Sequence, residues 1–213
     1  MDPCIADRAQ NGPVIVRSET PTDYEEIRAL VTVTMRPTDA ELVDLIRGSE
    51  NYIPDLALVA EHAERVVGYA LLSYVTLKGL GQRSVLALAP LCVRPERQRQ
   101  GVGAALLCTG LDRADAHGAP LVTVLGHPEY YRRFGFEPAR HYDIEPPSRD
   151  IPEGVFMVKP LSGYGHRFKG RIVYPPASTS HSSSVTSSRQ AERRRPIAAP
   201  RQDIHRLLSI ARR

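Results

Sequence analysis

The sequence predicts an α/β fold in which a mixed central sheet splays after Pro90 and carries helices on both faces. Three observations predict it. Short apolar runs with strand character alternate with amphipathic helical patterns along the first four-fifths of the chain. Pro90 interrupts the apolar run at residues 85–93, and a proline cannot donate a ladder hydrogen bond, so neighbouring strands are expected to part there. A glycine-bearing basic turn then leads from this strand into a helix.

The N-terminal part predicts one strand followed by two helices. The strand lies at residues 14–17. The first helix has Thr22 as its cap with Glu25 three residues later, which is the pattern of a capping box. The second helix has the same pattern at Thr38 and Glu41. Apolar residues recur at helical spacing in both, so we expect them to pack on the sheet.

The middle of the chain predicts a hairpin and the strand-turn-helix unit that follows it. Strands at residues 56–61 and 66–75 are joined by the short polar turn HAER. The strand at residues 85–93 then leads to a helix that begins near Gly101 and stops at Gly118.

The remaining elements complete the sheet. We expect a strand at residues 121–125, a short helix at residues 128–134 and a further strand from Phe136 onward. Closing strands are expected at residues 156–161 and 171–174.

The turn from Gln98 to Gly103 has the spacing Q-x-x-G-x-G and indicates an anion site. A helix start exposes unpaired N–H groups at the positive end of its dipole. Gly101 and Gly103 lack the Cβ atoms that would obstruct a phosphate, and Arg99 adds positive charge. An acyl-coenzyme A suits this arrangement, because its pantetheine amides can pair with strand groups left unpaired by the splay at Leu91 and its neighbours. The residues expected to bind it are Leu91, Cys92, Val93, Gln98, Arg99, Gln100, Gly101, Val102, Gly103 and Ala104.

Other interpretations of this turn fit less well. A dinucleotide fingerprint would place a third glycine at position 106, which is Leu106, and a P-loop would need a Lys-Ser/Thr pair. An ordinary tight turn without a ligand remains the alternative for the motif taken alone.

The turn and the sequence GHPEYYRRFGF at residues 126–136 together resemble the GNAT superfamily of N-acetyltransferases, in particular its YhbS-like branch. The similarity begins near Val14, includes LALVAEHAERVVGYALLS at residues 56–73 and extends to GRIVYPPA at residues 170–177. It implies a mostly antiparallel sheet. It also implies an enzyme that transfers acetyl from acetyl-CoA, its co-substrate, to a primary amine by direct attack, without a metal.

The resemblance implies a catalytic role for Tyr131, since the family's tyrosine four residues before a Gly-Phe pair lies beside the coenzyme sulfur. A phenol is neutral at physiological pH and holds a proton that it can give to a departing thiolate. Tyr130 is the adjacent competitor for this role, and packing in the core is the alternative role for Tyr131.

A general base is not identified from the sequence. His127 stands where the branch has an acidic residue, and its imidazole is one candidate base. The carboxylates of Glu129 and Glu61 are two further candidates. Water can relay the proton instead, so none of the three is assigned.

Composition divides the chain into a flexible N-terminus at residues 1–13, an acyltransferase domain at residues 14–177 and a Ser- and Arg-rich tail at residues 178–213 that is expected to be disordered. The tail carries a net charge of +6, which leaves −2 for the rest because the whole chain has +4. Two rival functions follow: a non-catalytic acyl-CoA sensor, or a nucleic-acid-associated protein that acts through the tail. No aromatic residue follows Tyr174, so the tail offers only weak, non-specific contact to nucleic acid.

The same composition predicts a cytoplasmic protein. No apolar run approaches the roughly 20 residues that a membrane helix needs, and the N-terminus lacks the pattern of a secretory signal. The cysteines show no C-x-x-C pairing, so no metal site is predicted. The amine acceptor is not identified, but the two N-terminal helices are expected to lie near it. Either a monomer or a homodimer is compatible with the sequence.

Overall fold

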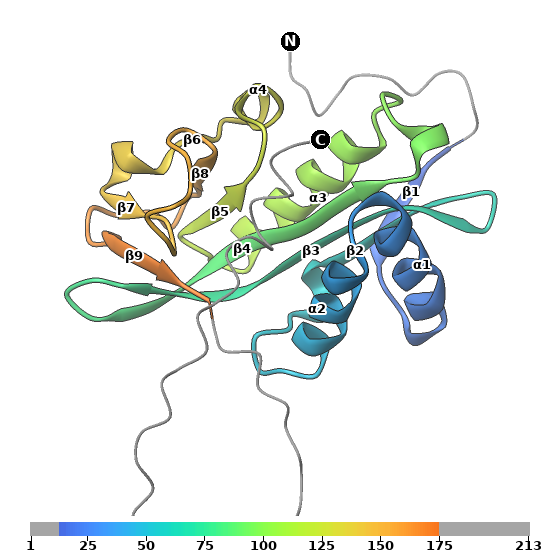
Figure 1. Ribbon diagram of the computed structural model, residues 1–213, viewed down its shortest axis with the longest axis horizontal. Coiled ribbons are helices and arrows are strands. Elements are labelled where there is room, and N and C mark those ends of the chain that lie inside the picture. The colour runs from blue at the N-terminus through green and yellow to red at the C-terminus, as the bar shows by residue number, and fades with distance from the viewer. Residues whose placement is uncertain (1–12, 175–213) are drawn as a thin grey trace, which may run out of the picture.

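A computed structural model describes residues 13–174, which form one sheet flanked by helices (Figure 1). The N-terminal segment predicted to be flexible, apart from residue 13, and the predicted tail at residues 178–213 lie outside the described residues.

The described strands are hydrogen-bonded in the order β1-β2-β3-β4-β5-β8-β6, while β9 pairs with β3 and with β7. All pairs are antiparallel except β4 with β5 and β7 with β9, so the sheet is mixed and mostly antiparallel, as predicted. The strands are β1 Ile15–Ser18, β2 Ala57–His62, β3 Arg65–Lys78, β4 Gln82–Val93, β5 Leu121–Leu125, β6 Glu137–Pro138, β7 Ile144–Glu145, β8 Phe156–Pro160 and β9 Gly170–Val173.

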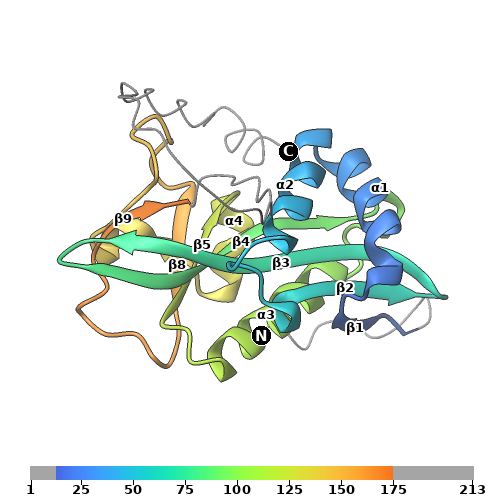
Figure 2. The same ribbon diagram turned by 90° about the horizontal axis from the view of Figure 1, so that it is seen from below.

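Helices cover both faces of the sheet. Helices α1 (Tyr24–Thr34) and α2 (Pro37–Arg47) lie on one face and α3 (Val102–Ala116) lies on the other, which Figure 2 shows with the strands between them. The fourth helix, α4 (Pro128–Tyr131), is a single turn after β5 and continues as a 3-10 turn through Phe134.

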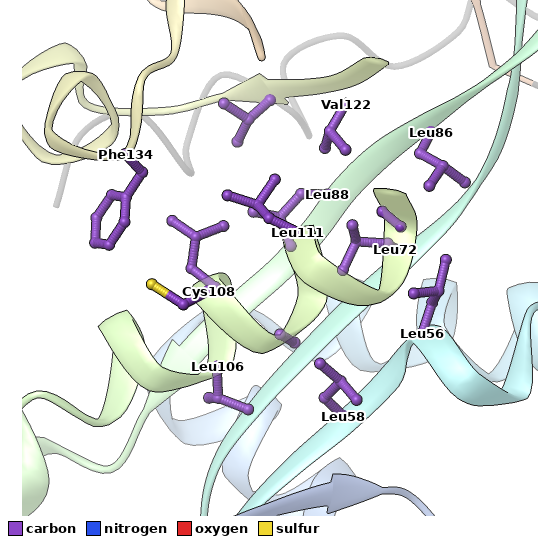
Figure 3. Close-up of a cluster of buried hydrophobic side chains, with 14 of the residues drawn as sticks. Leu56, Leu58, Leu72, Leu86, Leu88, Leu106, Cys108, Leu111, Val122 and Phe134 are labelled. Atoms are coloured by element: carbon purple, nitrogen blue, oxygen red, sulfur yellow. The ribbon is translucent and has the colours of Figure 1, made fainter. Parts of the chain in front are cut away.

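Period-two alternation along the strands separates two apolar layers. Leu58 and Leu72 point toward α3, where they pack with the helix's own leucines (Figure 3). Val59 and Leu71, each one residue away, join the layer beneath α1 and α2. Both faces of the central strands are therefore buried, and this explains why β2 and β3 read as nearly continuous apolar runs.

The splay lies between β4 and β5. Strand β5 pairs with β4 only from Leu86 to Leu88, whereas β4 continues to Val93 with β3 as its one strand partner. The register between β3 and β4 shifts at the same place. Ala70 faces Leu91 and Leu72 faces Leu88, so β4 contains one residue more than β3 over this stretch. Pro90 thus occupies a bulge, as the sequence predicts.

Neither capping box forms at the residues that the sequence predicts. The box forms two residues earlier than expected, where the Asp23 carboxylate accepts a hydrogen bond from the Thr20 N–H at 2.7 Å ahead of α1. Helix α2 begins at Pro37 and has Arg36 as its cap, with no side-chain cap bond. A proline at the first helical position has no N–H to satisfy, which reduces the need for such a cap.

Candidate active site

A cavity of about 1180 Å³ opens where β4 and β5 part. Four segments form its wall: the end of β4, the turn into α3, the segment from β5 through α4, and the junction of α1 with α2. The lining residues are Val33, Thr34, Met35, Arg36, Asp39, Leu91, Cys92, Val93, Pro95, Gln98, Arg99, Gly101, Gly103, Ala104, Gly126, His127, Glu129, Tyr130, Tyr131 and Arg133.

The end of β4 presents an unpaired strand edge to this cavity. The Arg94 N–H donates to Val67 O at 2.9 Å, so the main-chain groups of Arg94 point toward β3. Hydrogen-bonded positions alternate along an antiparallel pair, so the main-chain groups of Cys92, two residues earlier, point toward β3 as well. Successive residues of a strand face opposite sides, and therefore Leu91 and Val93 direct their N–H and C=O groups away from β3, into the splay. Val93 O accepts a hydrogen bond from the Gln98 amide at 3.1 Å, while the Val93 N–H and both main-chain groups of Leu91 are positioned to pair with an extended, amide-bearing ligand.

The turn into α3 presents a second set of donors. The first backbone hydrogen bond of the helix runs from Ala105 N–H to Gly101 O at 2.9 Å, and within residues 13–174 the N–H groups of residues 99–104 donate to no protein acceptor. Arg99 and Gly101 both have left-handed backbone conformations, with φ of 60° and 81°. The turn therefore folds into a concave array of N–H groups, a geometry that binds anions.

Two glutamines brace this turn. The Gln98 amide donates to Val93 O at 3.1 Å, and the Gln100 amide donates to Glu96 O at 2.9 Å. Both side chains are thus hydrogen-bonded within the loop and help to fix its shape.

Two adjacent tyrosines occupy different parts of the cavity. Tyr131 is 8% exposed and packs edge-on against Phe136, and a Cβ on Gly126 would lie 2.4 Å from its Cε2 atom. Burial raises the pKa of Tyr131 well above its ordinary value, so the phenol keeps its proton. The hydroxyl of Tyr130 instead lies over the start of α3, 2.9 Å from the position of a Cβ on Gly103.

Most of the predicted binding residues line the cavity, and two do not. Val102 is 3% exposed and packs in the core beneath α3, and Gln100 is exposed on the outer side of the turn. Those that do line it are Leu91, Cys92, Val93, Gln98, Arg99, Gly101, Gly103 and Ala104.

Cys92 is a structural residue of the cavity wall. Its thiol packs in the layer beneath α1 and α2, and burial raises its pKa to about 12. A thiol that stays protonated is a poor nucleophile, so Cys92 is poorly suited to form a covalent acyl-enzyme intermediate.

Of the three residues considered as a base, His127 and Glu129 line the cavity. Glu61 lies elsewhere, where it accepts a hydrogen bond from Arg17 Nε at 2.8 Å.

The α1–α2 wall was expected only as a general region near the acceptor. The structure places the exposed Val33 and the buried Asp39 in it, together with Arg36. No local sequence signal identifies these side chains, because their place in the wall depends on how α1 and α2 pack on the sheet.

Helix α2 is fixed to the sheet by a buried ion pair. Arg47 donates to both carboxylate oxygens of Glu19, at 2.8 and 2.7 Å, and Tyr52 donates to the same carboxylate at 2.8 Å. The guanidinium also lies 4.1 Å from the ring centre of Tyr24. These contacts hold the helix that carries Asp39.

The described residues contain no cluster of histidine, cysteine and carboxylate side chains able to hold a metal ion. Across residues 13–174, no helix has the length and apolar character to cross a membrane.

A splayed sheet, a concave helix start and a buried phenol are the features that the sequence predicts for an acyltransferase, and the comparisons with known proteins agree with that class. A family model described as an acetyltransferase (GNAT) domain matches residues 54–138. "Uncharacterized N-acetyltransferase YjhQ" of Escherichia coli strain K12 is 39% identical over 156 residues, which span 71% of this chain and 86% of YjhQ. The chain belongs to the GNAT acetyltransferase family.

Further relatives extend this result. "Uncharacterized N-acetyltransferase YhbS" of the same strain is 36% identical over 133 residues, which span 62% of this chain and 78% of YhbS. A crystal structure of Escherichia coli YhbS in complex with CoA superposes with a TM-score of 0.71 at 30% identity, over 79% of this chain and 95% of that one. A crystal structure of a GNAT family acetyltransferase from Brucella melitensis in complex with acetyl-CoA gives a TM-score of 0.63 at 28% identity, over 78% of this chain and 97% of that one.

Proposed function

We propose that this protein transfers the acetyl group of acetyl-CoA to a primary amine by direct attack, with Tyr131 as the general acid. One observation carries the proposal: the splay brings an unpaired strand edge, a helix start with free N–H groups and a buried phenol to one cavity. These three features come from separate elements of the chain, and one extended thioester ligand would contact all of them.

The residues fit coenzyme A. The main-chain groups of Leu91 and the Val93 N–H would pair with the amides of the pantetheine arm, and the N–H groups of residues 99–104 would bind the diphosphate. Gly103 leaves open a space that a Cβ would fill against the Tyr130 hydroxyl, at 2.9 Å. The bound coenzyme supplies an acetyl thioester with a thiolate leaving group.

The chain's own groups then assist the transfer. A main-chain N–H near Leu91 would hydrogen-bond the acetyl oxygen and polarise the carbonyl. As the amine nitrogen forms its bond to the carbonyl carbon and the carbon–sulfur bond breaks, Tyr131 gives its proton to the sulfur and is reprotonated from solvent. The proton lost by the amine passes to water.

The test is a screen of primary amines for free-thiol release from acetyl-CoA by the purified protein, with the acetylated product identified by mass spectrometry. Turnover with at least one amine is expected. Tight coenzyme binding without turnover on any amine would favour the acyl-CoA sensor, and failure to bind CoA or acetyl-CoA would overturn the proposal.

A further inference from the structure

Arg133 places a positive charge on the cavity wall beside α4, outside the turn that precedes α3. It follows α4 in the chain, and its guanidinium lies 5.0 Å from the ring centre of Tyr130 and 5.5 Å from that of Phe134. Its Nε donates to Tyr130 O at 3.5 Å. Within residues 13–174, no carboxylate lies within ion-pair distance of Arg133.

Tyr130 connects this charge to the helix start. Its hydroxyl is at Gly103, in the first turn of α3, while its ring face carries the Arg133 guanidinium. The helix start and the guanidinium are therefore separated by about the width of one aromatic ring. Both face the same cavity.

Coenzyme A carries anions with a matching separation. Its ribose bears the diphosphate on the 5′ carbon and a third phosphate on the 3′ carbon, so the two anionic groups are one sugar ring apart. A diphosphate held by the N–H groups of the turn would leave the 3′-phosphate within reach of a cation one ring away. A guanidinium held on aromatic faces is pre-oriented for a two-pronged contact with phosphate.

We propose that Arg133 binds the 3′-phosphate of the coenzyme and makes the enzyme prefer coenzyme A to its 3′-dephospho form. This inference rests on the proposed function, because it assumes that the diphosphate lies at the start of α3. Two other arginines line the cavity. Arg99 belongs to the turn itself and would serve the diphosphate, and Arg36 lies on the α1–α2 wall, beside Asp39.

The neighbouring Arg132 provides a matched control. It is exposed on the same turn and carries the same charge, but it does not line the cavity. Arg132→Gln and Arg133→Gln therefore change the net charge equally, one residue apart.

The experiment is isothermal titration calorimetry of the full chain with CoA and with 3′-dephospho-CoA, at one fixed ionic strength. We expect the unmodified protein to bind CoA about tenfold more tightly, as for one charge-assisted contact. Arg133→Gln should bring the affinity ratio close to one, Arg133→Lys should restore part of it, and Arg132→Gln should leave it unchanged. Circular dichroism with a thermal melt checks that each variant is folded.

Three outcomes would overturn the inference: equal affinity of the unmodified protein for the two coenzymes, an unchanged ratio in Arg133→Gln, or an equal loss in Arg132→Gln. Failure of the unmodified protein to bind either coenzyme would instead overturn the proposed function itself.

Discussion

Two side chains that are neighbours in the sequence serve different ends of the cavity. Tyr131 lies against Gly126, just beyond the end of β5, where the strands part. The hydroxyl of Tyr130 lies at Gly103, where the diphosphate would bind. Under the proposed function, Tyr131 would therefore serve the reacting sulfur and Tyr130 would lie beside the coenzyme phosphates.

Tyr131→Phe is expected to lower kcat by about 100-fold or more, because the leaving thiolate loses its proton donor. The KM for acetyl-CoA should change little, since the ring and its packing remain. Steady-state kinetics at saturating amine would measure both constants. The matched variant Tyr130→Phe should raise the KM for acetyl-CoA and leave kcat largely intact, and the reverse pattern would exchange the two assignments.

At the scale of elements, the turn before α3 owes its function to its backbone. Gly103 is in the first helical turn, so its replacement by alanine should favour the helix by up to about 1 kcal/mol. The new Cβ, however, would lie 2.9 Å from the Tyr130 hydroxyl, which must then move.

Gly103→Ala is therefore expected to weaken coenzyme binding while the melting temperature stays the same or rises. Calorimetry with CoA and a thermal melt would separate the two effects. Gly165→Ala is the control, because a Cβ there meets no atom within 4 Å. Unchanged affinity in Gly103→Ala would argue against a ligand at this turn.

The joint between β1 and α1 depends on an ionised carboxylate. Arg17 donates to both oxygens of Asp23 at 2.7 and 2.9 Å, and these bonds lower the pKa of Asp23 to about 2. A carboxyl whose pKa is lower in the folded state stabilises the fold above its unfolded value, here 3.8, and loses that effect as the pH falls toward 2.

Asp23→Asn is therefore expected to lower the free energy of unfolding by about 2 kcal/mol at pH 7, and the difference from the unmodified protein should shrink between pH 4 and pH 2. Urea denaturation across this pH range would measure it. Asp112→Asn, at an exposed aspartate with no ion pair among the described residues, should show little effect at any pH. A deficit that is independent of pH would show that the ion pair is not its cause.

Across the whole molecule, much of the architecture could be predicted because its signals are local. Pro90 predicts the bulge and the splay, and Gly118 predicts the end of α3. The spacing of apolar residues predicts which faces of the strands and helices are buried. The capping boxes were misplaced because a proline and an earlier Thr-Asp pair compete with them. Arg133 and the individual side chains of the α1–α2 wall were not identified, because their places in the cavity arise from contacts between segments far apart in sequence.

A chain truncated after Ala177 is expected to keep its acetyltransferase kcat and KM, because the lining residues found within residues 13–174 all lie between Val33 and Arg133. Amine acetylation by the full and truncated chains would be compared directly. If the basic tail were instead the working part, truncation would abolish salt-dependent nucleic-acid binding, and no acetyl transfer would be found in either chain.

The two halves of the cavity differ in the kind of atom that faces inward. Main-chain amides supply most of the coenzyme side, and amino-acid replacement leaves them in place as long as the bulge and the two left-handed residues survive. Side chains at the junction of α1 with α2 supply the opposite wall. We therefore expect that randomising residues 33–39 would change the amine specificity while the binding of acetyl-CoA stays constant.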